Sequence, residues 1–397
     1  MNEPVLFAAV GQRMPGGSGP LGINLYRMDG RSGALTFEEN VLPEITAGEL
    51  LADGKRDLLF AVNETGELRD PPESGAGIYS FHLDRMHRHL ELLGQQKTLL
   101  PYPCYLCLDQ SGKYLIVSHN GDKNHVTRIR PLADGSFTSD TVYDDAALIV
   151  FQVLPDGKIG RICDAAVAPA QGMSGKLAIR PGAPEGITAS TGVQPHLHCV
   201  AQSPDGLLTV AVDIGQSCLY SYRLEQDTGH LALLSTCAVR PAAQIRHGLF
   251  HSKNPLFYAN FEDIPYVAVF ACDGRSGAMH ETARVRTLPD ETQPAGSNAL
   301  ALHPNGETLY CSCLNDTISV FSLKTGGIPR REQTIACGGN RPRTLCITPD
   351  GEWLLSGNNR SHTIAVFRIQ PDGTLVNSGQ EAQHVMPSGM QAFPAFE

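Results

Sequence analysis

Histidine residues stand directly before one of the apolar segments of this chain, in a pattern suited to acid–base chemistry. His196 and His198 belong to the run Gln194-Pro195-His196-Leu197-His198. Alternate residues of an extended strand point to the same side, so this spacing predicts both imidazoles on one face. Such a pair can act as general acid and base, bind a metal ion or donate hydrogen bonds to a substrate. The alternative is a structural pair that bonds to loop carbonyls.

Charged side chains flank three other apolar segments in the same way. Arg246 and His247 precede one segment and Glu262 follows it, Arg343 precedes the last segment, and Glu64 follows LLFAVN (58–63). If the segments are repeats around one axis, these residues converge in one pocket. Carboxylates, imidazoles and guanidinium groups together suit an anionic substrate and general acid–base catalysis. Taken singly, each residue is better explained by a surface salt bridge, but their repeated placement at the ends of the segments argues against that explanation.

The apolar segments themselves form a repeat that must position these residues. A polar turn runs into a β-rich stretch in six copies, namely 52–62, 109–118, 203–212, 251–260, 303–312 and 348–357, and EPVLFAAVG (3–11) adds a seventh strand. Asp-Gly and Asn-Gly turns permit positive φ, and the residues that follow suit a pleated surface. Most turn positions are 45 to 58 residues apart. This period is typical of the four-stranded blades of a β-propeller.

A second series of strand–turn–strand segments has the same period. It comprises 26–37, 79–93, 150–162, 220–234, 269–281, 320–332 and 366–378. Each is a hairpin that cannot bury its apolar faces alone, so neighbouring units must stack. We predict an all-β, seven-bladed β-propeller with four-stranded antiparallel blades, closed by the N- and C-terminal strands, as one domain over 1–397. An ordinary β-sandwich would not produce this paired signal.

One gap of 94 residues, between Gly112 and Gly206, breaks the period. Residues 120–148 contain an extra strand–turn–strand unit, and residues 164–193 are rich in Gly, Pro, Ala and Ser. If these segments are insertions, the propeller has seven blades. If they form a blade of their own, it has eight. We favour seven, because the strand type of 109–118 occurs only once across the gap. The insertions are candidates for a hairpin, a lid or an oligomer contact.

Composition limits the class of protein. The net charge of −10, without a dense basic block, argues against nucleic-acid binding, although a few arginines can still dominate one pocket. No apolar run approaches the ~20 residues of a membrane span, and the N-terminus lacks a signal-peptide pattern. The chain has eleven cysteines, and this odd number indicates reduced thiols in a cytoplasmic protein. Cys104 and Cys107 form a single C-x-x-C on opposite strand faces, which disfavours zinc or redox use.

The chain resembles the bacterial lactonases with a seven-bladed propeller, typified by 6-phosphogluconolactonase and related to the fungal carboxy-muconate lactonising enzymes. The resemblance covers nearly the whole chain and is carried by 22–36, 58–64, 194–222, 245–270 and 341–369. The most specific part of the resemblance is the occurrence of three motifs in this order: P-H-x-H, D-I-G and R-H-x-x-F-H. It implies catalytic roles for His196, Arg246 and Glu262. His198, His247, Glu64 and Arg343 match neighbouring pocket positions, and we add His119 as a further substrate-binding candidate.

Departures from the family pattern bear on the substrate. Relatives often place Asn-Arg after the strand of blade six, whereas this chain reads Cys313-Leu314-Asn315. A guanidinium group that would help to bind a phosphate is therefore missing. The lactone of a non-phosphorylated sugar acid becomes at least as good a candidate as a phosphorylated one.

The resemblance implies hydrolysis of a lactone by general acid–base catalysis in the central channel. Glu262 or His196 would activate water, Arg246 would stabilise the oxyanion, and the other imidazole would protonate the ring oxygen. Open alternatives are a lactonising isomerase or lyase, a metal-dependent lactonase using His196, His198, Glu262 and His119, and a non-catalytic binding propeller. We predict no cofactor and no metal. The expected partner is a small lactone or sugar acid, without nucleic acid or membrane, for a monomer or homodimer.

Overall fold

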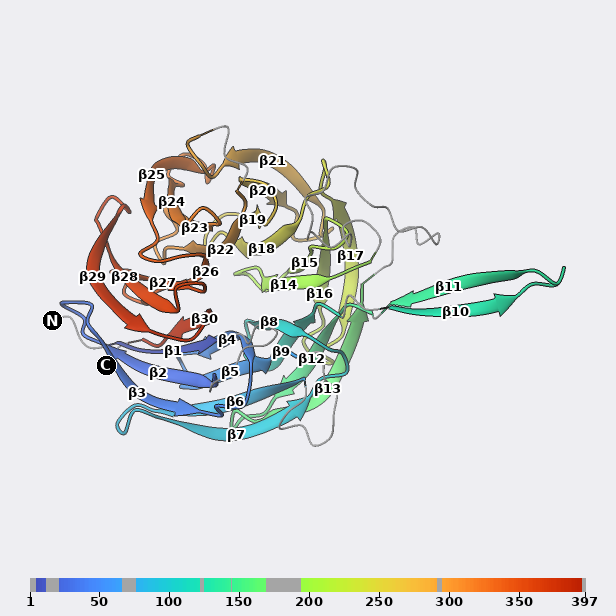
Figure 1. Cartoon of the computed structure of the whole chain (residues 1–397), viewed down its shortest axis with the longest axis horizontal. Coiled ribbons are helices and arrows are strands. Elements are labelled where there is room, and N and C mark those ends of the chain that lie inside the picture. Colours follow the sequence, from blue (N-terminus) through green and yellow to red (C-terminus); the bar gives the residue numbers. More distant parts are fainter. Residues whose placement is uncertain are drawn as a thin grey trace.

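Seven four-stranded sheets form a ring around a central axis (Figure 1). The computed structural model describes residues 5–11, 21–65, 76–121, 125–143, 145–168, 194–290 and 295–394. Neighbouring strands within each sheet are antiparallel. The predicted seven-bladed β-propeller is confirmed. In the described part of the chain, no helix is long and apolar enough to span a membrane.

The blades are numbered here from the N-terminus, and their strands are given from the channel outward. Blade 1 contains β30 (Pro387–Ala392), β1 (Val5–Gly11), β2 (Ile23–Met28) and β3 (Leu35–Val41). Blade 2 contains β4 (Ala47–Asp53), β5 (Leu58–Asn63), β6 (Gly77–Asp84) and β7 (His89–Lys97). Blade 3 contains β8 (Pro103–Leu108), β9 (Tyr114–His119), β12 (Ala147–Val153) and β13 (Ile159–Val167).

The remaining four blades each use consecutive strands. Blade 4 contains β14 (Leu197–Gln202), β15 (Thr209–Asp213), β16 (Cys218–Leu224) and β17 (Leu231–Ala238). Blade 5 contains β18 (Ile245–Phe250), β19 (Leu256–Phe261), β20 (Tyr266–Cys272) and β21 (Met279–Arg286). Blade 6 contains β22 (Ser297–Leu302), β23 (Thr308–Cys313), β24 (Thr317–Ser322) and β25 (Arg330–Ala336). Blade 7 contains β26 (Pro342–Ile347), β27 (Trp353–Asn358), β28 (Thr363–Ile369) and β29 (Leu375–Gln383).

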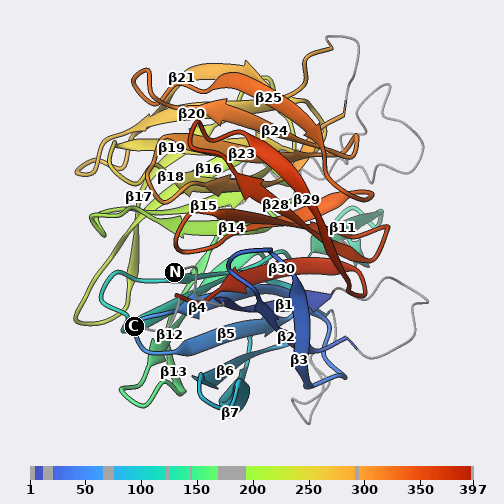
Figure 2. The ribbon, with the colours of Figure 1, turned by 90° about the vertical axis from the view of Figure 1, so that its left-hand side faces the viewer.

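The two ends of the chain close the ring in blade 1. The C-terminal strand β30 pairs antiparallel with the N-terminal strand β1, with Phe7 opposite Ala392 and Ala9 opposite Met390. Figure 2 shows the two strands side by side. The predicted closure by terminal strands is confirmed, and it joins residues from the extremes of the sequence in one sheet.

The predicted insertion at 120–148 is a hairpin inside blade 3. It contains β10 (His125–Pro131) and β11 (Phe137–Tyr143), which form a separate two-stranded sheet between β9 and β12. This hairpin projects away from the ring as an arm (Figure 1). The predicted insertion ended at residue 148, but residues 147 and 148 are the first two residues of β12. The eight-bladed alternative is wrong, because the hairpin joins none of the four-stranded sheets.

The second predicted insertion, 164–193, begins too early. Residues 164–167 are the last residues of β13, and residues 169–193 lie outside the described part of the chain. Sequence composition misplaced the start because Asp164, Ala165 and Ala166 have low strand propensity. Their pairing with β12 overrides that preference.

Contacts between adjacent blades rigidify the ring. Apolar clusters are shared by neighbouring blades, and aromatic side chains add hydrogen bonds to the next blade. The Tyr258 hydroxyl donates to Gly327 O at 2.7 Å, the Tyr310 hydroxyl to Gly373 O at 2.8 Å, and Trp353 Nε1 to Gly30 O at 3.2 Å. The ring therefore fixes the positions of its inner strands, which line the channel.

Each inner strand is irregular near its start. In all seven blades the pairing of the inner strand with its neighbour shifts register at this place. Such a β-bulge adds an unpaired residue and turns its side chain to a new direction. The fold thus turns one extra residue per blade toward the axis.

Candidate functional site

The bulges place seven residues at one level of the channel. This set, the bulge ring, consists of Gly48, Cys104, His198, Arg246, Asn298, Arg343 and Ser388. All of them except Asn298 line one small cavity on the axis, together with Glu49, Glu64 and His247. The cavity volume of about 10 Å³ is close to that needed by one water molecule. Two guanidinium groups, two carboxyl groups and two imidazoles therefore meet there.

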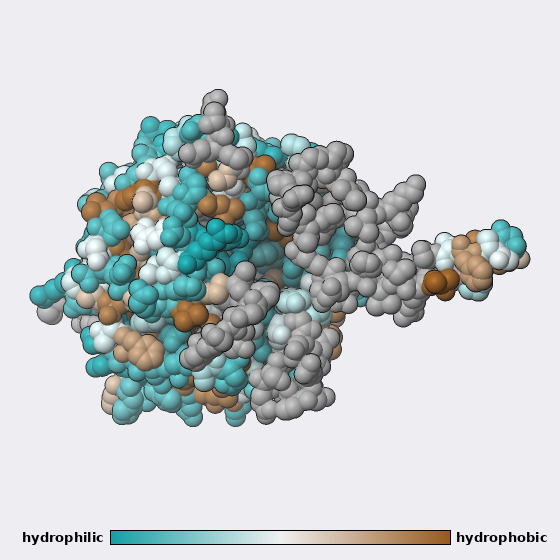
Figure 3. Space-filling model, viewed as in Figure 1, coloured by the Kyte–Doolittle hydropathy of each residue, from teal (hydrophilic) through white to brown (hydrophobic). Residues whose placement is uncertain are grey.

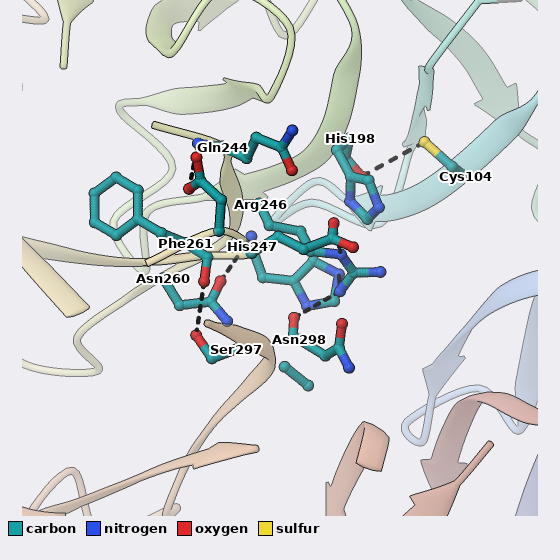
Figure 4. Close-up of polar contacts among 12 residues, drawn as sticks. Cys104, His198, Gln244, Arg246, His247, Asn260, Phe261, Ser297 and Asn298 are labelled. Atoms are coloured by element: carbon teal, nitrogen blue, oxygen red, sulfur yellow. Dashed lines mark hydrogen bonds and ion pairs between the residues drawn. The ribbon is translucent and has the colours of Figure 1, made fainter. Parts of the chain in front are cut away.

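Arg246 is the most tightly held member of the ring. Its side chain is 3 % exposed, its Nε lies 3.2 Å from Glu262 Oε2, and a terminal nitrogen donates to Asn298 O at 2.6 Å. Figure 4 shows the guanidinium beside Asn298 and His247. Burial lowers the pKa of Arg246, and the Glu262 charge opposes that shift. The side chain is a fixed, positively charged hydrogen-bond donor.

Glu64 and Glu262 occupy equivalent positions in blades 2 and 5. The Glu64 amide donates to Thr46 O and the Glu262 amide to Gln244 O, both at 2.8 Å, just beyond the second strand. Only Glu64 lines the cavity, whereas Glu262 carries the ion pair with Arg246. The Glu64 carboxylate lies against Gly48, where any β-carbon would overlap with its Oε2 atom. Gly48 is therefore needed to admit that carboxylate.

His198 and His247 lie next to each other in the channel. Their ring centroids are 5.2 Å apart, and the His247 ring is also 5.2 Å from that of Tyr105. His247 Nε2 accepts a hydrogen bond of 3.4 Å from Arg246. Burial, with the charges of Arg246 and Arg343, holds the pKa of His247 well below its usual value. His247 is thus neutral and accepts rather than donates toward Arg246.

Two of the sequence candidates lie away from this cavity. His196 precedes the bulge of β14, and its Nδ1 donates to the carbonyl oxygen of Asn120 at 2.6 Å. The bulge interrupts the strand alternation, so His198 lines the cavity and His196 does not. His119 is fully buried in blade 3, and burial lowers its pKa to about 4. The structure therefore brings together Glu64, His198, Arg246, His247 and Arg343, with Glu262 behind Arg246.

Sequence reasoning missed two channel residues. Cys104 lines the cavity, and its thiol donates to Leu197 O at 3.3 Å. Burial and the Glu64 charge raise the pKa of this thiol, which stays neutral. Glu49 follows Gly48 in β4 and also lines the cavity. Aligning the seven inner strands on their first residues would have revealed both positions.

A second cavity lies along the channel below the first. Its volume is about 260 Å³, near the lower end of ligand pockets at roughly 300 Å³. Glu49 and His247 line both cavities, which meet at these side chains. The lower cavity is otherwise lined by Tyr105, Thr344, Gln391 and strand residues of blades 6 and 7. A small polar ligand in the lower cavity contacts Glu49 and His247.

A metal centre has limited support in the part of the chain that the structure describes. No group of three or more His, Cys, Asp or Glu side chains is placed there to hold an ion. The upper cavity instead combines the guanidinium groups of Arg246 and Arg343 with the carboxyl groups of Glu49 and Glu64. This arrangement is suited to binding a polar, anionic molecule and to proton transfer.

The fold and the charged axial cavity define a propeller with a small-molecule site. The family model described as "Lactonase, 7-bladed beta-propeller" matches residues 8–391. The chain therefore belongs to this lactonase family and to the lactone-hydrolysing enzymes.

Individual relatives are similar over nearly the whole length. The chain is 22% identical to the 6-phosphogluconolactonase of Bacillus subtilis (strain 168), covering 87% of this chain and 89% of that one. It is 23% identical to the 6-phosphogluconolactonase of Formosa agariphila, covering 94% and 95%. The structure of the periplasmic gluconolactonase PpgL of Pseudomonas aeruginosa superposes with a TM-score of 0.78 at 23% identity, covering 99% of this chain and 100% of that one. This last likeness confirms the fold.

Proposed function

We propose that the protein hydrolyses the lactone of a sugar acid at the bulge ring. The observation that carries this proposal is the convergence of Arg246, Arg343 and Glu64 on one water-sized cavity. Two guanidinium groups, of which Arg246 is held in place by Glu262 and Asn298, can bind the lactone carbonyl and stabilise the oxyanion that forms on it. They can then hold the carboxylate of the product. The names of the relatives, gluconolactonase and 6-phosphogluconolactonase, support a sugar-acid substrate.

Glu64 is the carboxylate that we propose as general base. Its side chain lines the cavity with both arginines, where an attacking water would fit. Glu262 is engaged by Arg246 at 3.2 Å and is suited to orienting that guanidinium. His196 has its Nδ1 bound to a backbone carbonyl outside the cavity. The position of Glu64 in the lining of the cavity, which Glu262 and His196 do not share, favours it over these two bases expected from the sequence.

A phosphorylated lactone is the second candidate, and blade 7 provides the observation in its favour. Arg341 lies close enough to Arg360, Glu262 and Arg343 for their charges to act on it, and its pKa is lowered mainly by burial. These additional guanidinium groups can take the place of the arginine that is absent at Asn315. They would bind a phosphate beyond the lactone ring.

Acid release from paired lactones tests the proposal. Gluconolactone and its 6-phosphate would be added to wild-type protein in weak buffer with a pH indicator, against spontaneous hydrolysis. We expect acceleration of at least one of the pair. A preference for the phosphate ester that disappears in Arg341→Ala would assign phosphate binding to blade 7. Absence of acceleration with every sugar-acid lactone would contradict the proposed function.

We also propose a cytoplasmic location, because all eleven cysteines are free thiols in the structure. Fractionation of the source cells would test it, and recovery outside the cytoplasm would contradict it.

A further inference from the structure

Glu49 is a half-buried carboxyl group of the channel wall. It extends from β4, immediately after the bulge, and its Oε1 accepts a hydrogen bond of 3.0 Å from the Leu50 amide. On the other side Gly389 of blade 1 leaves space for it, since a β-carbon there would lie 2.6 Å from Glu49 Oε1. The site is therefore shaped around this carboxyl group.

Glu49 also occupies the junction of the two channel cavities. It is one of the two side chains, with His247, that line both of them. A lactone in the lower cavity whose carbonyl oxygen points up toward the arginines would therefore have Glu49 beside its ring. Glu64 is on the opposite side of Gly48 and reaches only the upper cavity.

The surroundings of Glu49 favour its neutral form. The titratable and charged groups that face it from the packed strands are Glu64, Tyr105, Cys199, Arg246, His247, Arg343 and Cys346. Burial raises the pKa of Glu49 to about 8, although the Leu50 amide and the charges of Arg343 and Arg246 lower it. The nearby Glu64 raises it further. At neutral pH Glu49 thus carries a proton that it can donate.

We propose that Glu49 is the general acid of the reaction and protonates the ring oxygen of the lactone as its C–O bond breaks. This inference rests on the proposed lactone hydrolysis at the bulge ring. Two carboxyl groups whose environments separate their protonation states commonly divide the acid and base roles. Here Glu64 is the base, and Glu49 replaces the imidazole that the sequence suggested as acid.

The step balances without any further reactant. Water gives a proton to Glu64 as its oxygen bonds to the carbonyl carbon, and the negative charge that forms on the carbonyl oxygen faces the arginines. The bond from that carbon to the ring oxygen then breaks, and the ring oxygen takes its electron pair and the proton of Glu49. The product is a hydroxy acid, which ionises. Transfer of the proton from Glu64 to Glu49 restores the starting state.

Glu49→Gln tests the inference, since glutamine keeps the shape of the side chain and cannot donate an acidic proton. We expect turnover of gluconolactone to fall about 10²- to 10⁴-fold. Dihydrocoumarin, whose leaving group is a phenol, needs little protonation, so its turnover should fall less than about tenfold. The basic limb of the pH–rate profile should also disappear. An equal loss on both lactones would indicate a structural role and overturn the proposal.

A titration that needs no substrate separates this inference from the proposed function. Protein labelled with carbon-13 at the glutamate carboxyl groups should show one resonance that titrates near pH 8. This resonance should be absent from Glu49→Gln and present in Glu64→Gln. If no such resonance exists, Glu49 is ionised at neutral pH and the inference is wrong, whatever the lactone assay gives. If it exists and wild-type protein opens no lactone, the proposed function fails instead.

Discussion

The two levels of the channel differ in charge although the inner strands of the blades supply both. The upper level, the bulge ring, contains two arginines and faces Glu64. The level directly below contains Glu49, Tyr105 and His247, whose burial favours their neutral forms. Burial lowers the pKa of both Arg246 and His247, which are adjacent in sequence, but the guanidinium starts from a much higher value and stays charged, whereas the imidazole is neutral. The upper level is suited to binding charge, and the lower level to holding a proton.

The largest expected effect is on the base of the upper level. Glu64→Gln should reduce turnover of the best sugar-acid lactone about 10²- to 10⁴-fold, because the attacking water loses its proton acceptor. Glu262→Gln is the matched control, since it occupies the equivalent position of blade 5. We expect a smaller loss there, because Arg246 keeps its bond to Asn298 O. Initial rates of acid release measure the turnover of both variants. A greater loss for Glu262→Gln than for Glu64→Gln would indicate that Glu262 is the general base.

Two glycines allow the levels to be disturbed separately. Gly48→Ala would push the Glu64 carboxylate aside, and Gly389→Ala would place a β-carbon 2.6 Å from Glu49 Oε1. We expect each to lower turnover about 10- to 100-fold through misplacement of a catalytic group. Gly389→Ala should in addition move the basic limb of the pH–rate profile, and Gly48→Ala should not. Gly94→Ala, whose nearest atom would be 3.9 Å away, is the control. Identical pH profiles for all three variants would contradict the division between the levels.

The repeat and the hairpins could be predicted from sequence, and the bulges could not. Turn residues and alternating strands report local backbone preference, which is why blades 1 to 7 and the arm were found. A bulge depends on pairing with the next strand, and it changes which residue faces the axis. The sequence therefore favoured His196, whereas β14 presents His198. Glu49 was missed because its significance lies in neighbours from blades 2, 5 and 7.

The lower level should also affect stability. Between about pH 4.5 and 8 the folded protein holds a proton on Glu49 that the unfolded chain releases. Stability of the wild type should therefore decrease across this window relative to Glu49→Gln, which has no such proton. Thermal unfolding from pH 4 to 9 measures the difference in Tm between the two proteins. We expect the Tm of Glu49→Gln to rise relative to that of the wild type as the pH increases to about 8. A difference in Tm that does not change with pH would contradict the neutral state of Glu49.

The arm should have the smallest effect on the reaction. The hairpin projects from the body of the molecule (Figure 3). Its residues Ile129 and Phe137 are exposed. Strands β9 and β12 pair directly, with His119 opposite Ala147. Removing residues 122–144 leaves Asn120, Gly121, Asp145 and Ala146 as a short turn. Turnover should remain within about twofold of the wild type, because none of the arm residues that the structure describes lines either cavity. A large loss of turnover would instead make the arm part of the site.

Cooperation between Glu64 and Arg246 is the most direct test of catalysis at the bulge ring. Rates of acid release from the best lactone would be measured for Glu64→Gln, Arg246→Ala and the double variant. Arg246→Ala alone should lose about 10²- to 10³-fold through the missing oxyanion donor. Because both groups act on one transition state, the double variant should lose much less than the product of the single losses. Losses that multiply, or an Arg246→Ala variant as active as the wild type, would contradict a single site on the axis of the propeller.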